Sequence, residues 1–368
     1  MITILDKYII RKFLSTFFFM LGIIMLLAIV FDIAEKLAEF IDNKAAVTDI
    51  VFKYYVNFFL FYGNTFSSLI VFISVIWFTA KMAQDSEIIP MLFSGKPFKR
   101  ILRPYFIGAT ILMLISLVLN HFILPRSNRV RLDFEEQYYR DKLYVENYQA
   151  EFPGNELMYY STFSENAVNE LVIQRFDDKN RLVYFMKARL AEYNKETEKW
   201  NLTDVVERFV KHVDSIPQNS DKPNQIEHLS EVKSKQVKFQ FTPKDIALRD
   251  NAVSAMTYSK LSEFIEKERK KGNPSLPSFE IELYQRTSYP FATYVLTLIG
   301  VSVSSRKKRG GIGINIAIGL MFVFLYIFSM KITTVAATNV GFPPIIAVWV
   351  PNFLFGILAI FLYRIAPK

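Results

Sequence analysis

The chain has 368 residues, of which 51% are hydrophobic, and a formal net charge of +9. It has no cysteine, which excludes disulfides, thiolate catalysis and cysteine-bound metals, and its three histidines form no metal-ligand spacing. The 35 Phe and 19 Tyr residues, together with long apolar runs, exclude an ordinary soluble domain.

Six apolar runs are long enough to cross the ~30 Å hydrocarbon core of a bilayer as helices. None has a charge in its central part, and they cover 13–31, 54–80, 103–124, 283–304, 312–333 and 344–363. The first run is too long for a signal peptide, and "AIVFDIAEKLAEF" offers no small-residue cleavage site. We therefore expect an α-helical polytopic membrane protein with six transmembrane helices, the first of them uncleaved.

Positive charge collects in alternate connections between these runs. The loop after the first run is mostly acidic, whereas the N-terminus, the loops after the second and fourth runs and the C-terminus are basic: Lys7, Arg11, Lys12; Lys81, Lys96, Lys99, Arg100, Arg103; Arg306, Lys307, Lys308, Arg309; Arg364, Lys368. Short basic loops remain in the cytoplasm, so both termini are predicted to be cytoplasmic. The net charge is then a topology signal rather than a sign of nucleic-acid binding.

That orientation places residues 125–277 in the periplasm, as an insertion that divides the membrane helices into three plus three. Residues 1–124 and 278–368 form the two membrane halves. In the insertion, "RLVYFMKARLAEYN" alternates as a half-buried strand, with Leu182 to Leu190 on its apolar face. "DDKN" (177–180) and "NKETEK" (194–199) resemble hairpin turns, so we expect an all-β, jellyroll-like domain.

The end of the insertion, "YSKLSEFIEKERKKGNPS" (258–275), predicts an amphipathic helix that ends at Gly272. The insertion contains no catalytic constellation, and capping the membrane part or binding a partner would explain it equally well. We therefore predict a transport subunit rather than an enzyme.

The segment "AKMAQDSEIIPMLFSGKPFKRILRP" (80–104) follows the second apolar run and is too short and too charged to cross a bilayer. "SGKPF" lacks the upstream glycine and the following Ser or Thr of a nucleotide-binding P-loop. If ATP drives the protein, another subunit must bind it, and that subunit needs a cytoplasmic helix to push against. Ion-coupled transport is disfavoured because the helix centres hold only neutral polar residues.

Four stretches resemble the LptF/LptG lipopolysaccharide-export permeases. They are "DKYIIRKFL", "AQDSEIIPMLFSG", "ELYQRTSYPFATYVLTLIGVSVSSRKKRGGIGINIAIGL" and "GFPPIIAVWVPNFLFGILAIFLYR". The likeness covers essentially the whole chain, and the start slightly favours the LptG-like half. It implies a second permease of this kind, a cytoplasmic ATPase dimer that binds ATP and Mg, a single-pass jellyroll partner (LptC-like) and a periplasmic bridge protein. Lipopolysaccharide would be extracted from the inner membrane and passed to that bridge, and this chain itself would bind no cofactor.

The resemblance also implies that residues 85–95 are a coupling helix in which Glu87 contacts the ATPase. Ser86 and Gly95 match the same pattern, and the apolar face of Ile88, Met91 and Leu92 would dock on that partner. A simpler reading makes Glu87 an acid in a helix's first turn. Pro90 departs from the pattern and requires the helix to start near Asp85–Glu87 or to be kinked.

Lipid phosphates in this family meet cations after the first membrane helix, where this chain has Asp32, Glu35 and Glu39. Acids repel phosphate, so either other cations take over or the lipid carries fewer phosphates. The candidate lipid-phosphate contacts are Lys36, Lys44, Lys331 and Arg286. Arg286 can alternatively pair with Glu282 four residues earlier.

The resulting prediction is a permease subunit of an ABC-type lipopolysaccharide exporter. Its lipid cavity would be lined by the first, second and fifth membrane helices. The rival interpretation is a non-transporting sensor or assembly platform with a periplasmic β domain.

Overall fold

The computed structural model describes residues 3–87, 90–91, 97–138, 144–152, 154–164, 166–212, 225–246, 250–305 and 311–366. The chain forms two compact units. A helical unit comprises Met1–Tyr139, Val253–Leu261 and Pro277–Lys368, and a β unit comprises Arg140–Ala252 and Ser262–Leu276. Each unit has its own hydrophobic core.

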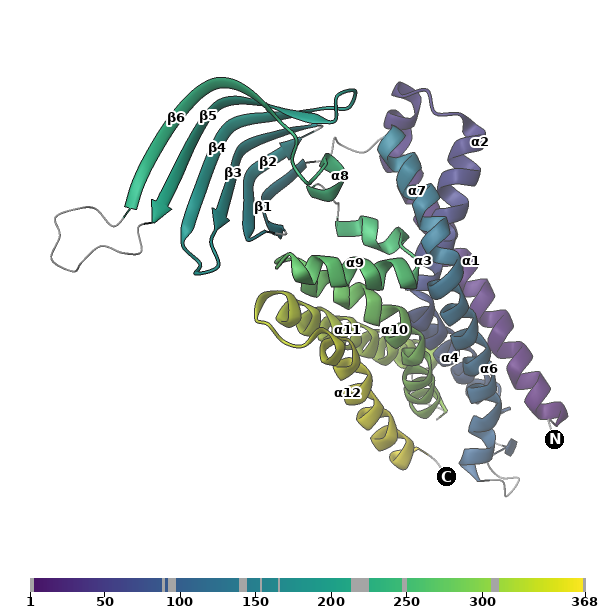
Figure 1. Ribbon diagram of the computed structural model, residues 1–368. Helices are drawn as coiled ribbons and strands as arrows, with labels where there is room; N and C mark the ends of the chain where they lie inside the picture. Colours follow the sequence, from purple (N-terminus) through teal and green to yellow (C-terminus); the bar gives the residue numbers. More distant parts are fainter. Residues whose placement is uncertain are drawn as a thin grey trace. The chain divides into compact units, whose positions relative to one another are not determined.

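The helices before the β unit are α1 (Ile4–Asp42), α2 (Val47–Asp49), the π-helix η1 (Ile50–Tyr55), α3 (Val56–Thr65), α4 (Ser67–Gln84), α6 (Phe98–Val118), the π-helix η2 (Leu119–Ile123) and α7 (Leu124–Tyr138). After the last strand come α8 (Pro243–Ile246), the 3₁₀-helix η3 (Asp250–Ala255), α9 (Tyr258–Lys270), α10 (Leu276–Ser304), α11 (Gly311–Asn339) and α12 (Pro344–Ile365). Figure 1 shows them in chain order.

Five helical stretches of the described chain are long and apolar enough to cross a membrane: Ile4–Asp42, Ser67–Gln84, Phe98–Tyr138, Gly313–Asn339 and Pro344–Ile365. They confirm a polytopic membrane protein. The 29-residue α10 contains the predicted fourth span, but it is not among these five. The count of six spans therefore stays a prediction.

Local sequence signals explain where several helices begin and end. Thr3 caps α1 because its hydroxyl accepts from Asp6 N–H while the Asp6 carboxylate accepts from Thr3 N–H. Pro97 precedes α6 and Pro343 precedes α12, where a missing N–H costs nothing. The predicted helix at 258–275 is confirmed as α9, followed by Gly272 in the left-handed region at φ +64°.

The π-helical turn η1 interrupts the regular hydrogen bonding between α2 and α3. The side-chain amide of Asn57 donates to the carbonyls of Phe52 (3.2 Å) and Lys53 (2.8 Å), and its own oxygen accepts from the Ser127 hydroxyl of α7 (2.7 Å). A π turn in a membrane helix needs such substitute partners, because hydrocarbon offers none. Asn57 therefore fixes the turn and ties α3 to α7.

Side-chain hydrogen bonds also join helices in the middle of α10, at the carbonyls of the two residues before Pro290. Ser68 of α4 donates to the Tyr289 carbonyl at 2.9 Å, and Asn352 of α12 donates to the Ser288 carbonyl at 3.0 Å. The Tyr326 hydroxyl of α11 then donates to the Asn352 side chain at 2.9 Å. Helices α4, α11 and α12 are thus joined to α10 around one proline.

The β unit contains β1 (Tyr144–Phe152), β2 (Glu156–Ser164), β3 (Ala167–Phe176), β4 (Leu182–Asn194), β5 (Lys199–His212) and β6 (Gln225–Val237). They form one antiparallel sheet in sequential order, and Figure 1 shows that its strands are strongly curved. The two predicted hairpin turns are confirmed: Asp177 accepts from two backbone N–H groups before β4, and Asn194 accepts from two before β5. An inserted all-β domain is therefore present.

The predicted alternation of β4 is right for Met186 and Ala188, which are buried, but wrong for Leu190, because Ala191 is buried in its place. The register places Arg189 between Glu170 of β3 and Asp204 of β5. Both acids have left-handed backbone conformations at φ 52°. That local irregularity shifts the inward-facing positions by one residue, which periodicity alone could not reveal.

The apolar face of this sheet ends at a buried carboxylate, Glu207 of β5. Lys235 Nζ lies 2.7 Å from its Oε2, and the Tyr184 hydroxyl donates to its Oε1. Burial tends to raise the pKa of Glu207, but these two donors outweigh it and hold that pKa below its usual value. The charge is therefore kept on the inner face rather than neutralised.

Close packing between α1, α4 and α6 depends on one glycine. Phe13 of α1 is fully buried and stacks on Phe78 of α4 at 5.6 Å. A Cβ on Gly108 of α6 would lie 2.5 Å from Phe13 Cδ1, well inside contact distance. The ring can therefore sit where it does only because residue 108 has no side chain.

We expect Gly108→Ala to destabilise the protein by about 1–3 kcal/mol, since overpacking outweighs the gain in helix propensity. Thermal unfolding of the purified chain in detergent measures the effect. The matched control is Gly22→Ala in α1, because a Cβ there meets nothing within 4 Å. Equal melting temperatures for the two variants would contradict this account of the α1–α6 contact.

Candidate functional site

The end of α4 is held to α1 through Glu87. Its carboxylate accepts from Lys12 Nζ at 3.1 Å and from the Tyr8 hydroxyl at 3.0 Å, while Lys12 also donates to Tyr8. Lys12 and Tyr8 stand four residues apart, so they lie on one face of α1. The Glu87 side chain remains about one-third exposed, at 33%, which leaves the carboxylate accessible from outside the unit.

A second ion pair ties α1 to the start of α6, beyond residues 88–96. Arg100 donates to both oxygens of Asp6, at 2.6 and 2.7 Å, in the two-pronged geometry that guanidinium and carboxylate favour. The Asp6 side chain is only 3% exposed, so this pair is the more enclosed of the two. The α1 end therefore contacts the chain on both sides of the predicted coupling helix.

The predicted coupling residues are only partly described. Ser86 has a left-handed backbone (φ 60°), and Met91 is half-buried against the core shared by α1, α4 and α6. Ile88, Leu92 and Gly95 lie outside the described residues. Asp85 is the C-cap of α4, and Glu87 N–H donates to the Met82 carbonyl at 2.8 Å, so the helix start predicted near Asp85–Glu87 is wrong: these residues form the turn that ends α4. Pro90 and Met91 are helical.

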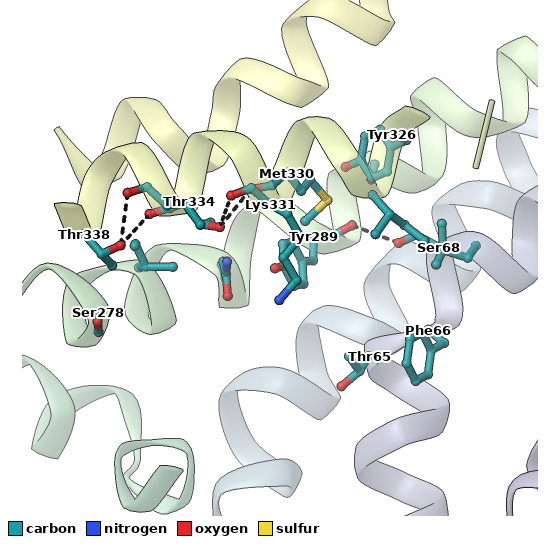
Figure 2. A pocket seen from close by; sticks show the side chains of 16 residues that line it. Thr65, Phe66, Ser68, Ser278, Tyr289, Tyr326, Met330, Lys331, Thr334 and Thr338 are labelled. Atoms are coloured by element: carbon teal, nitrogen blue, oxygen red, sulfur yellow. Dashed lines mark hydrogen bonds between the residues drawn. The ribbon is translucent and has the colours of Figure 1, made fainter. Parts of the chain in front are cut away.

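A cavity of about 600 Å³ lies between α3, α4, α10 and α11, and Figure 2 shows the side chains that surround it. Apolar side chains such as Phe66, Leu69 and Met330 alternate in its lining with polar ones. The full set is Thr65, Phe66, Ser68, Leu69, Ser278, Ile281, Gln285, Tyr289, Ala292, Tyr326, Ile327, Met330, Lys331, Thr334, Val335 and Thr338. A hollow lined by both apolar side chains and hydroxyl groups, with one ammonium, is suited to an amphiphilic ligand.

Lys331 is the only cation that lines this cavity among the described residues. Its side chain is exposed, and its ammonium makes no hydrogen bond or ion pair within the described parts of the chain. The neighbouring Thr334 and Thr338 hydroxyls donate to carbonyls of α11 itself. Among the described residues, the Lys331 ammonium therefore has no internal partner and lies beside apolar side chains, so it could bind the phosphate of a lipid.

Lys36, by contrast, is already engaged. Its Nζ lies 2.6 Å from Asp32 Oδ1 and 2.6 Å from the Tyr54 hydroxyl, and Tyr55 donates to the other Asp32 oxygen at 3.2 Å. The side chains of Lys36 and Asp32 are 18% and 11% exposed. The cluster joins α1 to η1. Lys44, just beyond α1, is exposed, with a left-handed φ of 53°.

Arg286 of α10 also has a full set of partners inside the helical unit. Its guanidinium donates to the carbonyls of Met256 (2.7 Å) and Val253 (3.1 Å) and to Glu282 (3.3 Å). The side chain is only 5% exposed. The local pairing with Glu282 expected as an alternative is therefore present, and Arg286 fastens the segment that contains η3 to α10.

Sequence reasoning did not find Lys12, Tyr8 or Arg100 as partners of acids near the coupling helix. The acids and bases are 75 to 94 residues apart in the sequence. The available signal was only the shortage of acids around two basic segments, which leaves Asp6 and Glu87 as obvious counter-ions. Within the described residues no group of three His, Cys, Asp or Glu could hold a metal ion.

These features define a class of protein: a multi-pass membrane protein with an inserted β domain and an apolar cavity among its helices. Only 11% of the residues in the most apolar stretch of α1, and 17% of those in the most apolar stretch of α11, are buried. The apolar faces of these two helices are therefore left for lipid or another subunit. The family model described as lipopolysaccharide export system permease LptF/LptG matches residues 7–365. The chain belongs to this family, whose members are transport components of the inner membrane; the match covers LptF and LptG together. No curated protein sequence matches the chain.

The Asp32–Lys36 pair gives a test of whether Lys36 is structural. We expect Lys36→Met and Asp32→Asn each to lower the free energy of unfolding by about 1–3 kcal/mol, because each leaves a poorly solvated partner. The double variant should recover at least half of that loss. Unfolding in detergent is the measurement.

The matched control is Lys53→Met, which breaks a more exposed pair with Asp49 in the same stretch and should change stability by less than about 0.5 kcal/mol. If the double variant is as unstable as the sum of the two singles, the coupling inferred from the geometry is absent.

Proposed function

We propose that this chain is the permease subunit of an ABC-type lipopolysaccharide exporter. It extracts lipopolysaccharide from the inner membrane and passes it to a periplasmic bridge, and ATP is hydrolysed with Mg on a separate cytoplasmic ATPase dimer. The family match over nearly the whole chain carries this proposal. The orientation follows from the basic connections, with both termini cytoplasmic and the β unit periplasmic.

The cavity beside Lys331 supports the lipid step. Its apolar walls suit acyl chains, and the unpaired ammonium suits a phosphate of the lipid headgroup. Among the four cations predicted to contact phosphate, Lys331 is the best placed, because Lys36 and Arg286 already have close acceptors. Lys44 is a second, more distant option at the end of α1. We assign the lipid to this cavity, whose lining includes α4 and α11, two of the three helices expected in the wall, together with α10.

The coupling step is placed at Glu87 and the residues that follow it. The ATPase would press on the segment 85–95, with Ser86, Ile88, Met91, Leu92 and Gly95 forming the contact surface. Glu87 would then exchange Lys12 for a cation of the ATPase. Since the Lys12–Glu87 pair is partly exposed, it contributes no more than about 1 kcal/mol to stability, so replacing Lys12 by a cation of the ATPase would cost little free energy.

The remaining partners complete the path. A second LptF/LptG-type permease would cover the apolar faces of α1 and α11, which the chain leaves uncovered. The β unit would contact the single-pass jellyroll partner and the periplasmic bridge protein through its antiparallel sheet. No cofactor is proposed for this chain itself.

Glu87→Ala and Lys12→Ala separate coupling from internal pairing. If Glu87 contacts the ATPase, its loss should lower the co-purified ATPase and the lipid-stimulated ATP hydrolysis by about tenfold, equivalent to ~1.4 kcal/mol. Lys12→Ala frees the same carboxylate and should leave both unchanged or raised. Pull-down from membranes and ATP turnover in nanodiscs are the measurements.

Equal losses in the two variants would mean that Glu87 serves only its pair with Lys12. At the level of the whole cell, depletion of the chain without a build-up of lipopolysaccharide in the inner membrane would contradict transport. The rival role as a sensor or assembly platform would then gain support.

For the cavity, we expect Lys331→Ala to weaken retention of lipopolysaccharide by the purified complex by about tenfold, since a charge-assisted hydrogen bond contributes ~1.5–3 kcal/mol. Lipid retained after detergent washing is quantified by mass spectrometry. Lys53→Ala, which removes an exposed lysine outside the cavity, is the control. With dephosphorylated lipid A the Lys331 variant should equal wild type; a persistent difference would rule out phosphate as the contact.

A further inference from the structure

A second cavity, separate from the one beside Lys331, lies where the start of α6 meets the ends of α10 and α12. Its volume is about 700 Å³. The lining comprises Pro97, Lys99, Arg100, Leu102, Arg103, Phe106, Leu298 and Tyr363. Apolar walls therefore stand beside a group of three cationic side chains.

The walls are held in place by contacts between the three helices. Phe98 of α6 stacks on Tyr363 of α12 with ring centroids 5.8 Å apart, and Phe106 of α6 stacks on Tyr294 of α10 at 6.1 Å. The Tyr294 hydroxyl also donates to Thr110 of α6 at 2.9 Å. The cavity is thus framed by packed aromatic side chains.

The cations differ in what they contact. Arg100 donates to Asp6 on α1 and is neutralised there. Lys99 and Arg103 are four residues apart, which places them on one face of α6. Both are exposed, and neither forms an ion pair or hydrogen bond with its side chain within the described part of the chain.

The surrounding sequence offers these two cations no counter-ion. Residues 88–132 contain no Asp or Glu, and neither do residues 283–368, which include all of α11 and α12. The stretches that precede α6 and follow α10 in the sequence, 92–96 and 306–310, contain only basic charged residues: Lys96, Arg306, Lys307, Lys308 and Arg309. Within the described residues, Lys99 and Arg103 therefore have no internal counter-ion.

We propose that this cavity binds an anionic phospholipid of the cytoplasmic leaflet. Its headgroup phosphate would contact Lys99 and Arg103, and one acyl chain would lie along Phe106 and Leu298. Basic pockets between membrane helices on the cytoplasmic side recognise anionic headgroups, and the cytoplasmic leaflet supplies them. A free anion would gain nothing from the apolar walls, whereas a phospholipid satisfies both parts of the site. The proposal rests on the cytoplasmic placement of the α6 start given above.

Bound there, the lipid would sit directly after the coupling residues 85–95. Its phosphate would hold the first turn of α6 from one side while Asp6 holds Arg100 from the other. The site would thus act as an anchor for the helix that follows the coupling segment.

Native mass spectrometry of the purified full chain with added phosphatidylglycerol or phosphatidylcholine tests the site. Wild type should prefer the anionic lipid. Lys99→Gln with Arg103→Gln should reduce that preference by roughly thirtyfold, from ~1 kcal/mol per basic residue. The matched control, Lys81→Gln with Arg364→Gln, removes two exposed cations that do not line the cavity and should change it less than twofold.

A second variant, Leu298→Trp, fills the apolar wall and should weaken binding of both lipids without changing the charge. Added inorganic phosphate at millimolar concentration should not compete; if it does, the site takes a free anion and the proposal fails. Equal losses in the cavity and control double variants would also overturn it. Since lipid binding is measured without transport or ATP, failure of the permease function would leave this result unaffected.

Discussion

Most of the apolar surface of α1 and α11 is left uncovered by the rest of the chain, so the helical unit depends on a solvent that is itself apolar. In hydrocarbon a backbone N–H or C=O without a partner inside the protein costs several kcal/mol. That cost explains why Asn57 donates to carbonyls of the π turn. Ser68 and Asn352 donate to carbonyls beside Pro290 and so tie α10 to α4 and α12. These hydrogen bonds help to determine which helices pack together. The hydrophobic effect alone does not, because lipid tails are as apolar as leucine side chains.

The same solvent decides how the charges are used. Near the helix ends three acids form internal ion pairs: Asp32 with Lys36, Asp6 with Arg100 and Glu87 with Lys12. No acid occurs after Glu282. Among the described residues, Lys331 beside one cavity and Lys99 and Arg103 beside the other form no internal ion pair. An amphiphile with a phosphate group fits the chemistry of both.

Much of the fold could be predicted because its signals are local. Long apolar runs, basic loops and hairpin turns each depend on neighbouring residues, and the helix at 258–270 was predicted from its periodicity and Gly272. The shift of the buried face at Leu190 was not predictable, since it arises from the backbones of Glu170 and Asp204 on adjacent strands. The roles of Lys36 and Arg286 were equally hidden. From the sequence alone, a lysine or arginine near a membrane surface suggests a phosphate ligand. The structure shows instead that Lys36 donates to Tyr54 and Arg286 to the Met256 carbonyl.

The two ion pairs near the start of α1 differ in exposure, which bears on the coupling proposed above. The Asp6 side chain is only 3% exposed and accepts from Arg100 through both oxygens, so separating the pair would leave a poorly solvated carboxylate. Glu87 is one-third exposed, and water already screens its pair with Lys12. A partner pressing on residues 85–95 would therefore displace Lys12 long before it disturbed Arg100. The end of the segment that joins α6 would stay fixed to α1 through Arg100, while the end that joins α4 would move. A push on residues 85–95 would then change the angle between α1 and α4.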